Sequence, residues 1–522
     1  MSETSLNRRQ FLHHAGALGL GAVFLPRMGR AAPARSGGDG PVPRPGIVFE
    51  KFEAGGLSHY SYFIGDTLSG EAAVIDPRRD VEAYVELARH HRLRITHAIE
   101  THVHADFVSG ARELAHRTGA EVHASVEGGA SYGFPVVPIH HGKVLRVGGV
   151  RLRALHTPGH TPEHMSFLAS ARGSSKDAWG LFTGDFLFVG SVGRPDLMGV
   201  ENTDRLARQL FDTLQGAFTE LPDALPIYPA HGPGSPCGAG IREPEGTPTL
   251  GGERRHNPAL REDDRKAFLR DLLFSQPPVP TYWPRMKEIN ARGPKILGEL
   301  PTPQPRKPEA FAETARNPQT QLLDTRDFFS FGGGHIAGAV NIGHAPSLSM
   351  WGGWILDPER PLALVLPEQA EAREVVQWLI RIGIERIETV LEGGMGQWVL
   401  AGKPFTSIPQ MSVHQLKQAL AEDRVRALDV RQPMEWDEKG HLPGARYLFL
   451  PEIPDKARTL DRSKPLAVYC GTGYRGSIGA SLLKREGFDV RTVPGSLGGW
   501  KAAGYEVVYP DKRQRASDTT RP

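Results

Sequence analysis

Histidine and aspartate residues follow four separate apolar runs in the first half of the sequence. In chain order, they are His102, His104 and Asp106 after the run 95–101, His160 after 152–159, Asp185 after 179–184, and His231 after 224–230. Imidazole and carboxylate groups are common ligands of catalytic transition metals. Strand ends converge at one edge of a sheet, so residues far apart in sequence can meet there. The pattern therefore predicts one polar metal-binding pocket built from strand ends.

Cys470 is the strongest candidate for a nucleophile. It follows an apolar run that ends at Tyr469, and a helical pattern with Ile478 and Leu482 begins a few residues later. A cysteine at such a strand-to-helix turn faces backbone N–H groups and the positive end of a helix dipole, which favours its thiolate. Arg475 in the same loop adds to this effect. We therefore predict a catalytic Cys470 assisted by Arg475, rather than an inert buried thiol.

Cys237 is the second of the two cysteines and lies shortly after His231. It either lines the metal pocket, where it would touch a substrate, or is only a small loop residue. The sequence leaves both interpretations open. The two cysteines are far apart in sequence, and a stabilising disulfide framework is not expected.

Short strands and helices must position the metal-binding residues. Between the strand-like runs 72–76 and 94–99, Val81, Tyr84 and Ala88 recur with helical spacing and form an apolar face. This alternation predicts mixed sheets with helices outside, in a domain spanning 47–255. Residues 241–310 contain many prolines and charges around one expected helix, and we interpret residues 256–310 as a linker or helical extension packed on that domain. The further segments expected are strands at 144–155, 164–168, 181–183 and 225–228, and the helix at 263–274.

The chain contains an internal duplication after residue 310. Leu-Asp-Thr-Arg at 323–326 corresponds to Leu-Asp-Val-Arg at 428–431, and other motifs recur at similar offsets. A period of about 100 residues indicates a duplicated domain, because solenoid repeats span about 20–50 residues. A strand precedes a helix in each copy, which predicts tandem α/β domains at 311–405 and 409–508. Leu366 stands in the first copy where Cys470 stands in the second, so we expect the first copy to be an inactive spacer or docking surface.

Residues 1–34 have the features of an export signal. Arg8 and Arg9 precede an apolar run from Ala15 to Leu25, and small residues follow. The apolar run is too short to span a bilayer, which needs about 20 residues. The paired arginines resemble a twin-arginine leader, which exports folded proteins. We therefore expect a periplasmic protein without stable membrane insertion.

Charge narrows the range of partners. The 522 residues carry a net charge of +3, and the arginines of the leader account for this excess. The near-neutral remainder has no electrostatic footprint for nucleic acid. We expect small molecules as partners. The sequence does not determine the oligomeric state, and a homo-oligomer is compatible with it.

Four motifs in the first domain resemble the metal-binding motifs of the metallo-β-lactamase superfamily. They are Thr-His-Val-His-Ala-Asp at 101–106, Thr-Pro-Gly-His-Thr at 157–161, Thr-Gly-Asp at 183–185 and Pro-Ala-His-Gly at 229–232. The resemblance implies an αββα sandwich. The superfamily pattern continues with histidine after the motif aspartate, whereas Phe107 stands here. Phenylalanine has no lone pair, so a tightly held metal pair is not expected.

Within that superfamily, the first domain resembles the persulfide dioxygenases. The resemblance implies one Fe(II) per chain, bound by His102, His160 and Asp185. Two imidazoles and one carboxylate suit Fe(II) and leave coordination positions for a sulfur anion and dioxygen. A zinc ion that activates water is the alternative. The residues then left to orient ligands, move protons or hold a second metal are His104, Asp106 and His231.

The duplicated domains resemble the rhodanese sulfurtransferases, with the six residues from Cys470 to Arg475 as the active loop. Residues 47–508 as a whole resemble a persulfide dioxygenase fused to two rhodanese-like domains. The implied reaction oxidises a low-molecular-weight persulfide, such as glutathione persulfide, with O2 to sulfite. Cys470 would then exchange sulfur between persulfide, sulfite and thiosulfate. Two alternatives stay open, namely a zinc-dependent hydrolase of thioesters or esters with regulatory rhodanese-like modules, and a non-catalytic sulfur carrier.

Overall fold

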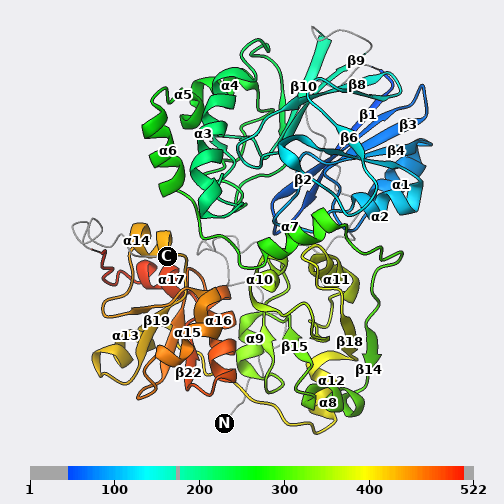
Figure 1. Cartoon of the computed structure of the whole chain (residues 1–522). Helices are drawn as coiled ribbons and strands as arrows, with labels where there is room; N and C mark the ends of the chain where they lie inside the picture. Colours follow the sequence, from blue (N-terminus) through cyan, green and yellow to red (C-terminus); the bar gives the residue numbers. More distant parts are fainter. Residues whose placement is uncertain (1–44, 172–176, 511–522) are drawn as a thin grey trace, which may run out of the picture. The chain divides into compact units, whose positions relative to one another are not determined.

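The computed structural model describes residues 45–171 and 177–510, all of which belong to one compact unit of the chain. The export signal predicted for residues 1–34 lies outside these ranges. Three α/β domains follow one another along the described residues (Figure 1). No helix among them is long and apolar enough to cross a membrane.

Two mixed β-sheets form the centre of the first domain. One has the strand order β1-β2-β3-β4-β5-β6, and the other has the order β13-β10-β9-β8-β7. The predicted strand at 144–155 is divided into two antiparallel strands, because the chain turns at Gly148, whose φ of 57° favours glycine. The strands are β1 (Ile47–Ala54), β2 (His59–Asp66), β3 (Glu71–Ile75), β4 (Arg94–Ile99), β5 (Glu121–Ser125), β6 (Val137–Ile139), β7 (Val144–Val147), β8 (Val150–His156), β9 (Met165–Ala171), β10 (Ala178–Gly184) and β13 (Ile227–Pro229), with a separate pair β11 (Leu187–Phe188) and β12 (Ser191–Val192).

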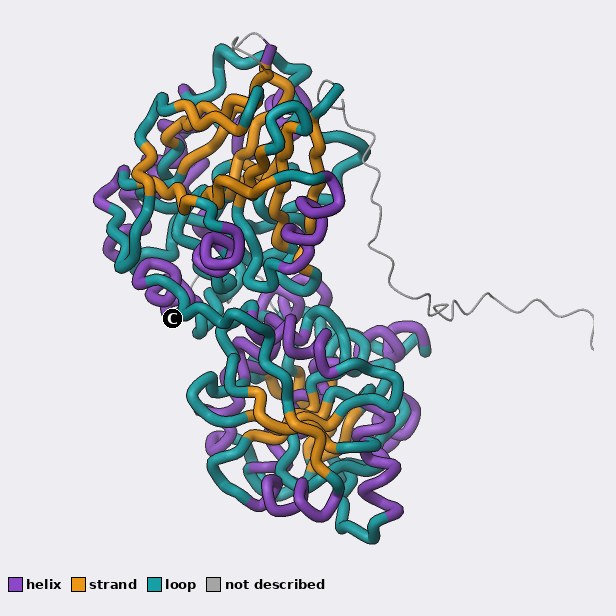
Figure 2. The backbone as a smooth tube through the Cα atoms, turned by 90° about the vertical axis from the view of Figure 1, so that its right-hand side faces the viewer, coloured by secondary structure: helices purple, strands orange, loops and turns teal. Residues whose placement is uncertain are grey.

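Three apolar clusters hold these layers together. Tyr62 and Phe167 lie in the cluster between the two sheets. The outer face of the first sheet packs against Tyr84 of α1, and that of the second sheet packs against Leu210 and Phe268 of two later helices. Helices therefore lie outside both sheets, as Figure 2 shows, and the predicted αββα sandwich is confirmed. The covering helices are α1 (Glu82–His91), α2 (Ala111–Thr118), α3 (Val200–Gly216) and α6 (Arg265–Phe274).

The segment after the second sheet contains four helices, so the expectation of a single helix there was wrong. Thr249, Asn257 and Asp264 each begin a helix by accepting a hydrogen bond from a backbone N–H group. Such caps stabilise short helices. The many prolines of this segment made these helices hard to recognise in the sequence. The helices are α4 (Leu250–His256), α5 (Pro258–Arg261), α6 and α7 (Trp283–Arg292).

Each of the two remaining domains contains a parallel sheet covered by helices. The sheets have the orders β14-β18-β17-β15-β16 and β20-β19-β21-β22, which confirms two tandem α/β domains. The first consists of β14 (Gln304–Arg306), α8 (Pro308–Arg316), β15 (Gln321–Asp324), α9 (Phe328–Gly333), β16 (Val340–Asn341), α10 (Leu348–Ile355), β17 (Leu362–Val365), α11 (Ala372–Ile380), β18 (Ile387–Leu391) and α12 (Gly394–Leu400). The second consists of α13 (Val413–Ala421), β19 (Arg426–Asp429), α14 (Pro433–Lys439), β20 (Arg446–Tyr447), α15 (Ile453–Lys456), β21 (Leu466–Tyr469), α16 (Tyr474–Arg485), β22 (Val490–Thr492) and α17 (Ser496–Ala502).

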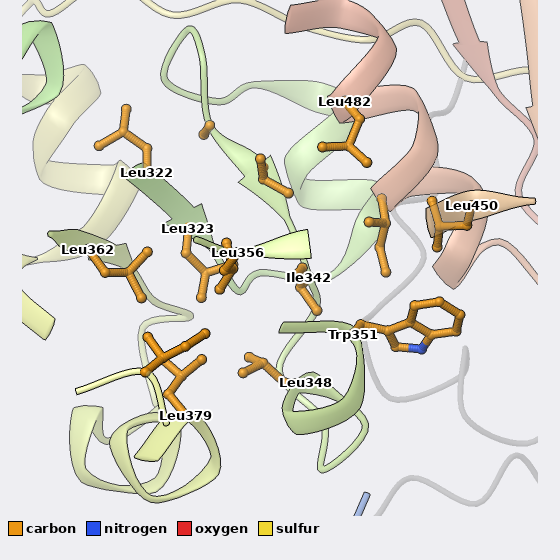
Figure 3. Close-up of a cluster of buried hydrophobic side chains, with 14 of the residues drawn as sticks. Leu322, Leu323, Ile342, Leu348, Trp351, Leu356, Leu362, Leu379, Leu450 and Leu482 are labelled. Carbon is orange, nitrogen blue, oxygen red and sulfur yellow. The ribbon is translucent and has the colours of Figure 1, made fainter. Parts of the chain in front are cut away.

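The two parallel-sheet domains share one apolar core. Leu450 and Leu482 of the second lie in the same buried cluster as Ile342 and Trp351 of the first (Figure 3). Ser477 Oγ of α16 also lies 2.6 Å from Asn341 Oδ1 and donates to it. The first copy is therefore packed against the helix that follows Cys470.

A buried ion pair joins the first parallel-sheet domain to the αββα domain. Arg381, which follows α11, donates to both oxygens of Asp80 at 2.7 and 2.8 Å. Its carbonyl also accepts from the N–H of Val108 at 2.7 Å. Because Val108 follows the motif from His102 to Asp106, this contact fixes the chain directly after the predicted metal ligands.

Candidate metal centre and reactive cysteine

Three predicted metal ligands converge from three strand ends. His102 follows β4, His160 follows β8 and Asp185 follows β10, and potential ligand atoms of all three lie within 4.8 Å of one another. Asp185 Oδ2 is 3.4 Å from His160 Nε2 and 3.8 Å from His102 Nε2. Donors about 2.1 Å from one ion are separated by about 3 to 3.5 Å, so a small contraction would place these three around a metal.

Hydrogen bonds orient the imidazoles of His102 and His160 so that their Nε2 atoms face Asp185. His160 Nδ1 donates to the carbonyl of Arg194 at 2.8 Å, so Nε2 carries the lone pair. Thr101 Oγ1 donates to Asp76 Oδ2 and therefore accepts from His102 Nδ1 at 2.8 Å. The lone pair of His102 is then also on Nε2. Partners of this kind fix the ring orientation of metal-binding histidines.

The charge states of the three residues suit a cation. Burial lowers the pKa of both His102 and His160, so both rings are neutral ligands at neutral pH. Burial alone would raise the pKa of Asp185, but the adjacent His231 outweighs it and keeps this carboxyl ionised.

The residues present fit a resident metal ion. His160 Nε2 and Asp185 Oδ2 are buried acceptors without a hydrogen-bond partner among the described residues. A buried acceptor left without a partner is costly, and a cation between them would satisfy both. Two imidazoles with one carboxylate are the donor set of non-haem Fe(II) sites with open positions, although zinc also accepts it.

His231 lies between Asp185 and Asp106 rather than among the three donors. Its Nδ1 is 2.6 Å from Asp185 Oδ1, and its Nε2 is 2.8 Å from Asp106 Oδ2. Burial lowers the pKa of His231, but the two carboxylates outweigh it and raise that pKa well above its ordinary value. His231 is thus an imidazolium that turns Asp185 Oδ2 toward the other donors.

Cys237 lies beside the hydrogen-bonded chain of Asp185, His231 and Asp106. Potential ligand atoms of Cys237, Asp106 and His231 come within 4.8 Å of one another, and the thiol is 1% exposed. Burial raises the pKa of Cys237 to about 12, so the thiol is neutral. The structure therefore places Cys237 beside Asp106 and His231, next to the three converging donors.

Cys470 occupies the predicted strand-to-helix turn. It follows β21 and precedes α16, and its Sγ accepts a hydrogen bond from the N–H of Gly473 at 3.2 Å. Ser496 Oγ donates to the carbonyl of Val493 at 2.8 Å and accepts from the N–H of Cys470 at 3.1 Å, so it holds the backbone of this turn. The sulfur thus faces a backbone N–H donor, which stabilises a sulfur anion.

Arg475 is fixed by a residue that the sequence patterns did not identify. Its guanidinium donates to both carboxylate oxygens of Glu435 in α14. Glu435 neutralises part of the positive charge of Arg475. Arg475 therefore stabilises an anion at Cys470 less than an unpaired arginine would. In the first copy, Leu366 follows β17 as predicted, and no thiol is present at that turn.

The comparisons with known proteins agree with this arrangement. Residues 54–231 match the model of the Metallo-beta-lactamase superfamily, and residues 307–401 and 412–503 match the model of the Rhodanese-like domain. The mitochondrial persulfide dioxygenase ETHE1 of Homo sapiens is 30% identical over 210 residues, which are 39% of this chain and 74% of the relative. The chain belongs to the metallo-β-lactamase superfamily. Two rhodanese-like domains follow its metallo-β-lactamase domain.

Two further relatives define the range of this similarity. A metallo-β-lactamase from Staphylococcus aureus, known from a crystal structure, is 33% identical in sequence to this chain. The two structures superpose with a TM-score of 0.58 over 66% of this chain and 98% of the relative. A hydroxyacylglutathione hydrolase from Francisella tularensis is 30% identical over 34% of this chain and 63% of its own length. The metallo-β-lactamase domain is therefore similar to proteins named for three different activities.

Asp76 and Glu100 lie in the site of the metallo-β-lactamase domain without having been predicted, and they hold the predicted residue His104. His104 Nε2 is 3.1 Å from Asp76 Oδ1 and 3.3 Å from Glu100 Oε2, away from the three converging donors. Burial lowers the pKa of His104, but the two carboxylates outweigh it and raise it to about 10. His104 is thus a buried cation, and through Asp76 it stabilises the hydrogen bonds that orient His102. Asp76 ends a strand at the same sheet edge, which was the signal available in the sequence.

Phe107 packs beside the metal centre of the metallo-β-lactamase domain. Its ring centroid lies 4.0 Å from that of His59 and 4.5 Å from that of His104. Phe107 is 1% exposed and belongs to the apolar cluster that continues into the first rhodanese-like domain. The residue that replaces a metal-binding histidine thus has a packing role.

Proposed function

We propose that the metallo-β-lactamase domain is an iron-dependent persulfide dioxygenase whose sulfur chemistry is coupled to transfer at Cys470. The convergence of two Nε2 lone pairs and one carboxylate oxygen at His102, His160 and Asp185 carries this proposal. The similarity to persulfide dioxygenase ETHE1 over most of that relative's length supports it.

The proposed reaction consumes one persulfide, one dioxygen and one water. The sulfur–sulfur bond breaks, the outer sulfur loses four electrons and leaves as sulfite, and the inner sulfur leaves as the thiol. Dioxygen accepts the four electrons. Iron(II) bound by the three residues supplies adjacent positions for a sulfur anion and dioxygen.

The residues of the chain have separate tasks in this scheme. Thr101 and the Arg194 carbonyl hold the rings of His102 and His160 in place. The imidazolium of His231 occupies Asp185 Oδ1, so only Oδ2 is directed at the metal. Phe107 and the surrounding apolar side chains exclude water, which protects a reactive sulfur species from side reactions.

Cys470 provides the second activity. Its thiolate attacks the outer sulfur of thiosulfate or of a persulfide, so a new sulfur–sulfur bond forms while sulfite or a thiol leaves. The N–H of Gly473 stabilises the sulfur anion, and Ser496 holds the backbone N–H of Cys470 in place. The first rhodanese-like domain has Leu366 at the equivalent turn and carries no nucleophile there.

Metal content measured together with oxygen uptake tests the proposed reaction. Protein purified without oxygen should contain about one iron per chain and consume dissolved oxygen when given glutathione persulfide. Sulfite should appear in equal amount. Two zinc ions per chain and no oxygen uptake with any hydropersulfide would contradict the proposal.

Hydrolysis of a thioester or ester is the second candidate function. The similarity to a hydroxyacylglutathione hydrolase favours it, as do the buried groups of Asp106, His231 and Cys237 beside the first three donors. Zinc-loaded protein that releases thiol from acylated glutathione, with no oxygen consumption, would support this alternative.

We further propose that residues 1–34 direct export of the folded protein to the periplasm. Arg8 and Arg9 are the residues on which a twin-arginine leader depends. In a Gram-negative host, the full-length chain should appear in the periplasmic fraction. Changing both arginines to lysine should retain it in the cytoplasm, and equal export of both forms would overturn this proposal.

A further inference from the structure

Helix α7 lies outside the region matched to the superfamily and packs against the metal centre. Trp283, Lys287 and Asn290 are spaced by four and three residues, so they lie on one face of this helix. Trp283 and Asn290 are 1% and 6% exposed. The face that carries Lys287 is therefore the face that covers the metallo-β-lactamase domain.

Asn290 joins this face to the first metal-binding motif. Its Nδ2 donates to the carbonyls of His104 and Phe107 at 2.8 and 2.7 Å, and its Oδ1 accepts from the N–H of Ser109 at 2.9 Å. Asn290 and His102 also line the same small cavity, of about 20 Å³. One end of the helix face thus borders His102.

Trp283 joins the other end of this face to His160. The guanidinium of Arg194 lies over the Trp283 ring at 5.7 Å, and the carbonyl of Arg194 accepts from His160 Nδ1. Lys287 is one helical turn from each of these anchoring residues. Its side chain therefore leaves α7 between Asn290, which lines the same cavity as His102, and Trp283. Trp283 in turn contacts Arg194, the hydrogen-bond partner of His160.

The ammonium group of Lys287 has no anionic partner. Its Nζ contacts the thioether sulfur of Met198, and no ion pair joins it to a carboxylate in the described part of the chain. A thioether is a weak acceptor and leaves most of the donor capacity of an ammonium unused. Burial lowers the pKa of Lys287, and the negative charge of Glu163 opposes this shift. The side chain keeps some solvent access, so an anion can reach it.

We propose that Lys287 is a specificity-determining residue that binds a carboxylate of the thiol portion of the substrate. The inference rests on the proposed function, since it assumes that a low-molecular-weight persulfide enters this centre. A persulfide made from a thiol acid would place its sulfur at the metal and its carboxylate at Lys287. Persulfides without a carboxylate would lack this contact.

Equilibrium binding of two matched thiols tests the proposal without turnover. N-acetylcysteine and N-acetylcysteine amide differ only in the carboxylate, and titration of the metal-loaded full chain under nitrogen measures both dissociation constants. We expect the acid to bind at least about 10-fold more tightly, as a charge-assisted hydrogen bond in a partly buried site would give. Lys287→Met, which keeps the length of the side chain, should abolish this preference, and Lys287→Arg should keep most of it.

Arg292→Met is the matched control. Arg292 is on the same helix but is exposed and paired with Glu288, so its loss should leave the preference unchanged. Equal binding of the two thiols by the wild type, or a preference that survives in Lys287→Met, would overturn the proposal.

Oxygen uptake separates this inference from the proposed function. With persulfides of the two thiols, Lys287→Met should raise KM about 10-fold for the acid alone and leave kcat unchanged. If the wild type consumes no oxygen but still binds the acid through Lys287, the proposed function fails and the carboxylate site stands. If oxygen is consumed with equal KM for both persulfides, the carboxylate site fails and the proposed function stands.

Discussion

Alanine in place of His160 is expected to abolish persulfide-dependent oxygen uptake, with a loss of more than about 100-fold, because changes even to outer partners of a metal site cost about 10- to 100-fold. The substitution removes one of the three converging donors and leaves Asp185 Oδ2 with a single imidazole opposite it. Iron content of the purified variant should fall in parallel. An oxygen electrode and elemental analysis measure the two quantities.

The control for this prediction is His116→Ala. His116 lies on the exposed side of α2, so its loss should change neither iron content nor oxygen uptake. His160→Gln preserves more of the side-chain volume and guards against a folding defect, which circular dichroism would reveal. Full iron content with full activity in either His160 variant would exclude this residue as a ligand.

Serine in place of Cys470 is expected to abolish sulfur transfer from thiosulfate while oxygen uptake persists. The hydroxyl of serine is a far weaker nucleophile than a thiolate near neutral pH, so the loss should exceed about 1000-fold. Thiocyanate formation from thiosulfate and cyanide measures the transfer. Cys237→Ser should keep this activity, since Cys237 lies in the metal pocket.

The two variants together test the division of labour between the domains. If His160→Ala and Cys470→Ser lose oxygen uptake to the same extent, the two sites do not act separately. If Cys470→Ser retains sulfur transfer, the transfer depends on another thiol, and Cys237 becomes the residue to examine.

The metal donors could be predicted because strand order brings them together without any knowledge of side-chain packing. His102 follows a strand of the first sheet, and His160 and Asp185 follow strands of the second, so strand ends from both sheets meet at one edge of the sandwich. The role of His104 could not be predicted in this way. Its position depends on Asp76 and Glu100, whose carboxylates turn the ring away from the other donors.

Residues whose role depends on a contact with a partner far away in the sequence could not be predicted. Glu435 binds Arg475 across 40 positions of sequence, and nothing in the local pattern of either residue predicts that contact. Helix α7 was hidden in a segment interpreted as a linker, because prolines interrupt its flanks. Its contacts with His104 and Phe107 depend on Asn290, a residue type that carries no clear signal by itself.

The ion pair of Arg381 with Asp80 bears on how such a protein can change over generations. A metallo-β-lactamase domain severed from its neighbour would leave the carboxylate of Asp80 without its main partner, and would expose the apolar surface around Phe107 and Val108 to water. Exposure of this apolar surface would lower the stability of the separated domain, because burial of apolar surface is a main source of that stability. The first rhodanese-like domain thus stabilises the metallo-β-lactamase domain through its inward face. A gene fission at this boundary would take that support from the separated metallo-β-lactamase domain.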